Sequence, residues 1–97
     1  MYSKLKDEIV NVFFSNGSAL KDWILIFNMD YHIARDNHIG NGVCIGYWHI
    51  REINMYEVYV FSNDFVVTTK YKNYNDMLKG MLGSLILYSY CKQRTNG

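Results

Sequence analysis

Residues 43–61 read VCIGYWHIREINMYEVYVF. β-Branched and aromatic side chains dominate this stretch, and they favour β-strands because they pack well on a pleated surface. The composition predicts one strand over 43–50 and a second over 56–61. A third strand is expected over 65–70, after the turn-forming residues Ser62-Asn63-Asp64. The middle of the chain is therefore expected to be an antiparallel sheet.

Two further segments extend this predicted sheet toward the N-terminus. Trp23-Ile24-Leu25-Ile26-Phe27 is a continuous apolar run, typical of a strand in mid-sheet or buried on both faces. Asn41-Gly42 suits a two-residue type I′ turn, because both residues tolerate a positive φ. This turn would join a strand that ends near Ile39 or Gly40 to the strand that begins at Val43. The expected sheet is a meander of four or five antiparallel strands.

Helices are expected at both ends of the chain. Near the N-terminus, apolar residues recur with helical spacing, with Ser3 as the cap and Asn16-Gly17 as the stop. Near the C-terminus, Asn73 or Asn75 can cap a longer helix, and Asp76 suits its first turn. The apolar stripes of the two helices are Leu5, Ile9, Val12 and Phe13, and Met77, Leu78, Met81, Leu82, Leu85 and Ile86.

The length of 97 residues fits a single domain that spans residues 1–97. Its predicted fold class is α+β: an N-terminal helix, the four- or five-stranded antiparallel meander, and a C-terminal helix packed on the sheet. Hydrophobic residues make up 49% of the chain and charged residues 20%, which excludes the charge-rich composition of a disordered protein.

The charge balance argues against several partners. Ten Lys and Arg residues stand against 9 Asp and Glu residues, a net charge of +1. Neither the basic face of a duplex-DNA binder nor the acidic surface of a DNA mimic is therefore expected. The longest uncharged stretch, residues 80–91, is too short to cross a bilayer, and the N-terminal residues lack the apolar region of a signal peptide. We expect a cytoplasmic protein that binds neither duplex DNA nor a membrane.

The predicted hairpin would have one polar face. If its loop has two residues, Gly40 faces Val43 and the register of every other pair follows. All three histidines would then share a face, with His49 diagonal to His32 and Asp36 and within reach of long side chains. This face would consist of Asp30, His32, Ala34, Asp36, His38, Ile45, Tyr47, His49 and Arg51.

Three interpretations of this polar face stay open. Polar residues alternate with core residues on any half-buried hairpin, so the face can be exposed to solvent without having a function. Alternatively, His32, Asp36 and His49 form a divalent-metal site, since imidazole and carboxylate ligands suit zinc or nickel. In the third interpretation the face binds an anionic or peptide partner, with Arg51 and Tyr47 as anchors.

No catalytic motif accompanies these residues. Cys44 would face the core in this register, away from His49, so we expect a small buried hydrophobe rather than a nucleophile. Gly40, Gly42 and Gly46 lack the Gly-Lys-Ser/Thr ending of a phosphate-binding loop, and Gly46 indicates a bulge or a close backbone approach. The sequence therefore predicts neither an enzyme nor a bound cofactor.

The back of the C-terminal helix carries little charge. A solvated helix face is usually more polar, and it rarely keeps two glycines that each cost roughly 1 kcal/mol. This surface is expected either to pack against the N-terminal helix or to contact a second copy or another protein. Opposite the apolar stripe it consists of Asp76, Lys79, Gly80, Gly83, Leu87 and Tyr90.

The leading functional hypothesis is a small non-enzymatic protein-binding module, such as an inhibitor, an immunity-type protein or an accessory protein of a phage or mobile element. A protein partner is expected, and the C-terminal helix offers a surface for a homodimer. The 9 tyrosines suit such contacts. One alternative is a metal- or ligand-binding protein or enzyme that uses the His/Asp face. Another is a single-stranded nucleic-acid binder that stacks bases on sheet aromatics. The candidate binding residues are His32, Asp36, Tyr47, His49, Arg51, Gly83, Leu87 and Tyr90.

Overall fold

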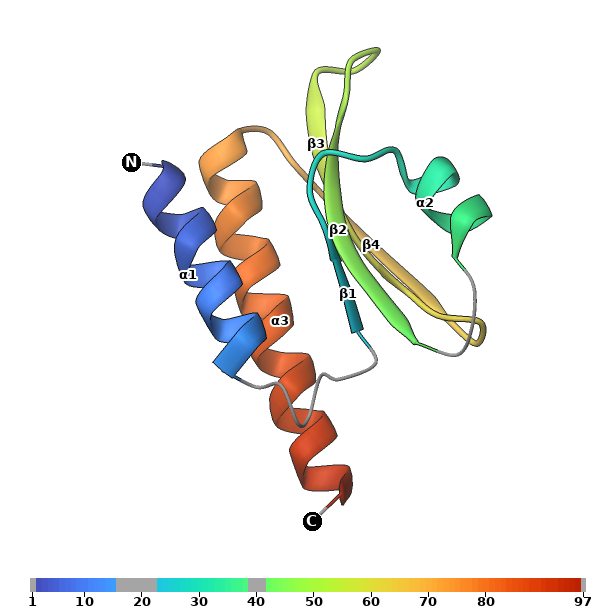
Figure 1. Cartoon of the computed structure of the whole chain (residues 1–97). Helices are drawn as coiled ribbons and strands as arrows, with labels where there is room; N and C mark the ends of the chain where they lie inside the picture. Colours follow the sequence, from blue (N-terminus) through green and yellow to red (C-terminus); the bar gives the residue numbers. More distant parts are fainter. Residues whose placement is uncertain (1, 16–22, 39–41, 97) are drawn as a thin grey trace.

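The computed structural model describes residues 2–15, 23–38 and 42–96. Its elements are α1 (Tyr2–Ser15), β1 (Trp23–Ile26), α2 (Tyr31–Asn37), β2 (Val43–Ile50), β3 (Met55–Phe61), β4 (Val66–Tyr71) and α3 (Tyr74–Asn96). Helices α1 and α3 lie side by side on one face of the sheet, and α2 lies on the other side (Figure 1). The predicted α+β class, with a helix at each end and the C-terminal helix packed on the sheet, is confirmed.

The strands form one four-stranded sheet in the order β1-β2-β3-β4. β2 and β3 pair antiparallel, from Cys44 opposite Phe61 to Ile50 opposite Met55, and β3 pairs antiparallel with β4. These three strands match the predicted segments to within a residue at each end. β1 differs, because it pairs with β2 in parallel, with Trp23 opposite Val43.

The prediction of a strand before the Asn41-Gly42 turn is wrong. Tyr31–Asn37 form α2 instead, and Asp30 caps this helix by accepting a hydrogen bond from the His32 amide (2.7 Å). Because β1 and β2 are parallel, the chain must cross back along the sheet before β2 begins, which a two-residue hairpin cannot do. Asn41 itself lies outside the described residues.

β1 occupies an edge of the sheet rather than the middle that its apolar run predicts. Trp23 is buried with the core beneath α1 and α3, whereas Ile24, which points to the opposite face, is 44% exposed. A continuous apolar run in this chain therefore marks a strand with one buried face and one partly covered face.

The side chains of β3 point alternately into two apolar clusters, one on each face of the sheet. Val58 and Val60 are buried in the cluster that includes α1 and α3 residues. Tyr59 and Phe61 are buried in the other cluster, to which α2 contributes Ala34. This strand is therefore apolar on both faces, and the sheet is the middle layer of the molecule.

Local capping decides where α3 begins. Asn73 Oδ1 accepts a hydrogen bond from the Asp76 amide (2.8 Å), and Asn73 Nδ2 donates one to Asp76 Oδ2 (3.0 Å). This reciprocal pair confirms Asn73 as the cap and Asp76 as a first-turn residue. In contrast, α1 begins at Tyr2, ahead of the predicted cap Ser3. The predicted stop at residues 16 and 17 lies outside the described part of the chain.

Candidate binding pocket

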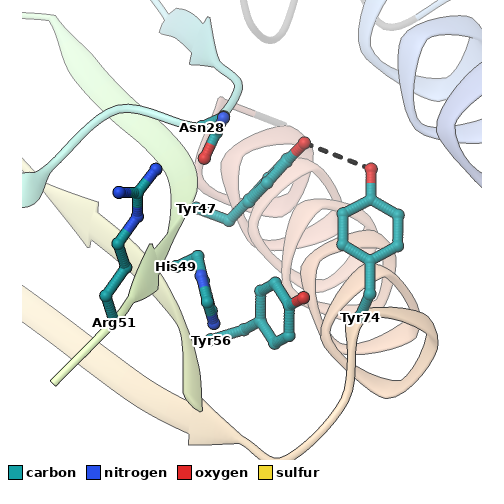
Figure 2. A pocket seen from close by; sticks show the side chains of 6 residues that line it. All are labelled: Asn28, Tyr47, His49, Arg51, Tyr56 and Tyr74. Atoms are coloured by element: carbon teal, nitrogen blue, oxygen red, sulfur yellow. Dashed lines mark hydrogen bonds between the residues drawn. The ribbon is translucent and has the colours of Figure 1, made fainter. Parts of the chain in front are cut away.

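A pocket of about 450 Å³ opens at the end of β2, on the face of the sheet beneath α3. Its walls come from the segment between β1 and α2, from β2 and the turn after it, from β3, and from the first residue of α3. Arg51 and Tyr74 lie at opposite ends of the group (Figure 2). The lining side chains are Asn28, Tyr47, His49, Arg51, Tyr56 and Tyr74.

Three of the predicted binding residues, Tyr47, His49 and Arg51, meet at this pocket. They occupy alternate positions along β2 and into the turn that follows it. Alternate residues of a strand point to the same face, which explains their convergence. The shared face that the sequence predicted for these three residues is confirmed, although the hairpin from which it was inferred is not.

Tyrosine hydroxyls and rings form the inner wall of the pocket. Tyr47 Oη and Tyr74 Oη share a hydrogen bond (3.2 Å), and the Tyr74 ring contacts those of Tyr47 and Tyr56 edge-on, with centroids 5.8 Å and 5.6 Å away. Burial, the hydrogen bond to Tyr74 and the nearby Tyr56 raise the pKa of Tyr47 well above its ordinary value. Tyr47 therefore stays a neutral phenol, suited to hydrogen bonding rather than to acting as a base.

His49 is held in place from two sides. Its Nε2 donates a hydrogen bond to Asn54 Oδ1 (2.9 Å), and its ring lies 4.6 Å from that of Tyr56, directly across the β2–β3 pair. Asn54 has a positive φ of 50°, which asparagine adopts more readily than most residues. The turn between β2 and β3 thus fixes both a backbone reversal and the orientation of the imidazole.

The lining of the pocket favours negative charge. Arg51 is the cationic side chain of the lining, and none of the six lining residues is acidic. Tyr74 begins α3, so the positive end of the helix dipole lies at the same opening. The arginine side chain and the helix N-terminus together suit the pocket to an anionic group.

His32 and Asp36 do not join this pocket. Both are exposed on α2, which packs on Tyr59 and Phe61, the face of the sheet opposite His49. The prediction of one polar face is therefore wrong. The geometric basis for a metal site shared by His32, Asp36 and His49 is lost with it. Within residues 2–15, 23–38 and 42–96, no cluster of three or more His, Cys, Asp or Glu could hold a metal ion.

The third histidine, His38, contacts Cys44, although the predicted hairpin would have kept the two side chains on opposite faces. His38 Nδ1 and Cys44 Sγ lie 3.3 Å apart in a hydrogen bond, and the imidazole packs edge-on against Phe61. Cys44 is 1% exposed, and burial raises the pKa of its thiol. The prediction that Cys44 is buried is confirmed, whereas the register that placed every histidine on the face away from it is wrong.

The back of α3 divides into a packed part and an open part. Gly80 faces the ring of Tyr71 on β4, where a side chain would collide with the phenol. Gly83 has open space around it, and Leu87 is 59% exposed. The side chain of Tyr90, the third predicted binding residue here, lies outside the described part of the structure. Gly83 and Leu87 are far along α3 from Tyr74, so they are not part of the pocket.

Sequence reasoning missed half of the lining: Asn28, Tyr56 and Tyr74. Tyr56 could have been found by pairing the two strands of residues 43–61 with each other, since it lies directly opposite His49. Tyr74 directly follows the cap Asn73, but only the packing of α3 on the sheet brings it to β2. Asn28 has a positive φ of 55°, and no local pattern marks it.

None of the described helices combines the length and apolarity needed to cross a bilayer. Comparison with known proteins found no matching protein family, no matching characterised protein and no matching solved structure.

Proposed function

We propose that this chain is a small non-enzymatic protein-binding module that receives an anionic group of its partner in the pocket at the end of β2. The observation that carries the proposal is the lining itself: three tyrosines line the pocket together with Arg51, His49 and Asn28, and no acidic residue is among the six. A carboxylate on a partner protein is the commonest group that such a lining would accept.

The residue types of the pocket are those that anchor protein interfaces. Tyrosine and arginine are enriched among the few side chains that supply most of the binding energy in such interfaces. Tyr47 and Tyr74 already hold each other through their hydroxyls, and His49 is held by Asn54. Because these side chains are ordered before binding, association would lose little conformational entropy in them.

Exposed apolar side chains beside the pocket favour a protein over a small ion. Met29 directly follows the lining residue Asn28, and its amide donates a hydrogen bond to the Tyr47 carbonyl (3.1 Å). Met29 is 39% exposed, and Ile53, in the turn after Arg51, is 52% exposed. Exposed apolar side chains next to tyrosine and arginine anchors supply the apolar area that a protein partner buries.

The proposal is tested with the wild-type chain and two charge-reversed variants as baits in lysate of the source cell. Arg51→Glu places a carboxylate in the pocket, and Arg35→Glu makes the same change on α2, across the sheet. We expect a nuclease-resistant protein partner that wild type and Arg35→Glu retain and that Arg51→Glu loses. Oligoglutamate should compete for that partner, and oligolysine should not.

Other outcomes would replace the proposal. A partner retained equally by all three baits would place binding outside the pocket. Material that nuclease releases would favour the single-stranded nucleic-acid alternative. Thermal melts of both variants within a few degrees of wild type are the control for folding, since Arg35 and Arg51 are both exposed.

A further inference from the structure

Among the residues that the structure describes, the strongest unassigned feature is the unpaired edge of the sheet at β4. β4 is the last strand in the order β1-β2-β3-β4, so one side of its backbone pairs with β3 and the other faces outward. Residues 66–70 are all exposed, including the apolar Val66 (48%) and Val67 (46%). An edge strand of this kind presents a row of amide and carbonyl groups that another strand can pair with.

β4 lacks the usual features that protect an edge from pairing. It contains no proline, because the whole chain has none, and the described backbone from Val66 to Tyr71 pairs with β3 without a break. Its single charge, Lys70, is drawn onto the face of the sheet by Glu57, whose Oε2 lies 3.4 Å from the ammonium. The backbone edge therefore stays accessible.

We propose that a second copy of this chain pairs with β4, antiparallel and about a two-fold axis at Thr68, so that two four-stranded sheets join into one. A two-fold axis perpendicular to the sheet puts the same face of both copies on the same side of the joined sheet. Residues that lie opposite each other must therefore belong to the same face. Val66, Thr68 and Lys70 share the face that α2 covers. In the proposed register Thr68 faces Thr68, and Val66 faces Lys70 of the other copy.

Charge complementarity favours a second copy as the occupant. Asp64 lies two residues before β4 and Lys72 one residue after it, and both are exposed. In the register centred on Thr68, Asp64 of each copy lies opposite Lys72 of the other, which places an oppositely charged pair at each end of the shared ladder. The charges on either side of β4 are thus complementary to those of a second copy in this register.

The proposed pairing forms a dimer and goes no further. It also does not depend on the proposed function of the pocket. A two-fold contact uses the β4 edge of both copies, so it ends at a dimer rather than continuing into a fibre. No residue that lines the pocket belongs to β4, so each copy would keep its own pocket. The dimer also differs from one formed through the exposed part of α3.

Sedimentation velocity over a concentration series tests the inference. Wild type is expected to move from the 11.5 kDa monomer to twice that mass as concentration rises. Thr68→Lys should stay monomeric, because two lysines would face each other across the axis, and so should Thr68→Glu. An equimolar mixture of the two variants should regain the dimer, since the facing charges are then opposite.

Two further variants separate this interface from others. Leu87→Glu alters the open part of α3 and should leave the dimer unchanged. Asp64→Lys should weaken dimerisation, and Asp64→Lys combined with Lys72→Asp should restore it. A wild type that stays monomeric at every concentration would overturn the inference. A dimer lost in Leu87→Glu but kept in Thr68→Lys would overturn it as well, and so would a double reversal that restores nothing.

Discussion

At the scale of single residues, Glu57 shows how the sheet accommodates a buried charge. It is 8% exposed, and it lies between Trp48 on β2 and Lys70 on β4 in the strand register. Trp48 Nε1 donates a hydrogen bond to Glu57 Oε1 (2.9 Å), and Lys70 approaches the other carboxylate oxygen. A carboxylate in this position is tolerated because both of its oxygens have a partner.

Glu57→Ala is expected to lower the free energy of unfolding by about 1–3 kcal/mol, because it leaves the Trp48 indole N–H without its acceptor in a half-buried site. Lys70→Ala should cost less than about 1 kcal/mol, since the Lys70 side chain is 48% exposed and its ion pair is screened by water. Urea unfolding of both variants measures the difference. Equal losses would show that the ion pair, not the indole hydrogen bond, stabilises this carboxylate.

At the scale of elements, the two glycines of α3 have opposite roles although they are one turn apart. Gly80 lies where α3 crosses β4, and the Tyr71 phenol fills the space that a side chain would take. Nothing lies within 4 Å of the position that a side chain at Gly83 would occupy. Close packing therefore explains Gly80, whereas nothing in the structure explains Gly83.

The two alanine variants should move stability in opposite directions. Gly83→Ala is expected to raise the free energy of unfolding by roughly 1 kcal/mol, because alanine has the higher helix propensity and meets no contact. Gly80→Ala should lower it despite the same gain in propensity, because the Tyr71 ring must move. Thermal or urea unfolding of the pair is the measurement, and each variant serves as the control for the other. A stabilising Gly80→Ala would contradict the close approach of Tyr71.

Helix α2 shows why an element of seven residues is hard to assign from its pattern. Tyr31, Ala34 and His38 recur with helical spacing and contact the Cys44, Tyr59 and Phe61 face of the sheet. The segment also allowed alternation, because Tyr31 and Ile33 would share one face of a strand, and Ala34 is the only residue of the helix that is fully buried. With one buried residue, periods of 2.0 and 3.6 cannot be told apart. The Asp30 cap was the local signal for a helix.

At the scale of the whole molecule, the sheet separates two buried phenols. Tyr47 lies on the face beneath α3, and Tyr59 lies on the face that α2 covers, where its hydroxyl donates a hydrogen bond to the Met29 carbonyl (2.8 Å). Burial raises the pKa of both phenols above the ordinary 10.0. For Tyr59, Cys44 and Asp30 add to the shift. The phenols on the two faces of the sheet therefore both make the folded state less stable at alkaline pH.

The free energy of unfolding is expected to fall as the pH rises above 10.0. Unfolding lowers the pKa of Tyr47 and Tyr59 to their ordinary value, so above this pH the unfolded chain binds fewer protons than the native chain. Stability then has a negative slope with pH. Urea unfolding at intervals from pH 8 upward measures it, and Tyr47→Phe should make the slope shallower. A slope that Tyr47→Phe leaves unchanged would contradict the role of this phenol.

Much of the architecture and half of the pocket followed from local pattern. Alternation placed Tyr47, His49 and Arg51 on one face of a strand, and the structure confirms that face. The other lining residues come from segments that are distant in sequence: Asn28 before α2, Tyr56 on β3 and Tyr74 on α3. A single strand pattern carries no information about which strands or helices pack beside it, so these partners were not predicted.

The sequence by itself determined the three strands of the meander, the apolar stripes of α1 and α3 except for the exposed Ile86, and a cap for α3 at Asn73 or Asn75. Each of these depends on residues within a few positions of one another, because side-chain alternation, helical spacing and capping are short-range effects. Only the tertiary structure decided that Tyr31–Asn37 are helical, that β1 pairs in parallel with β2, and that His32 and Asp36 lie across the sheet from His49. Those outcomes depend on which distant segments share backbone hydrogen bonds and apolar surface, and that competition is settled over the whole chain.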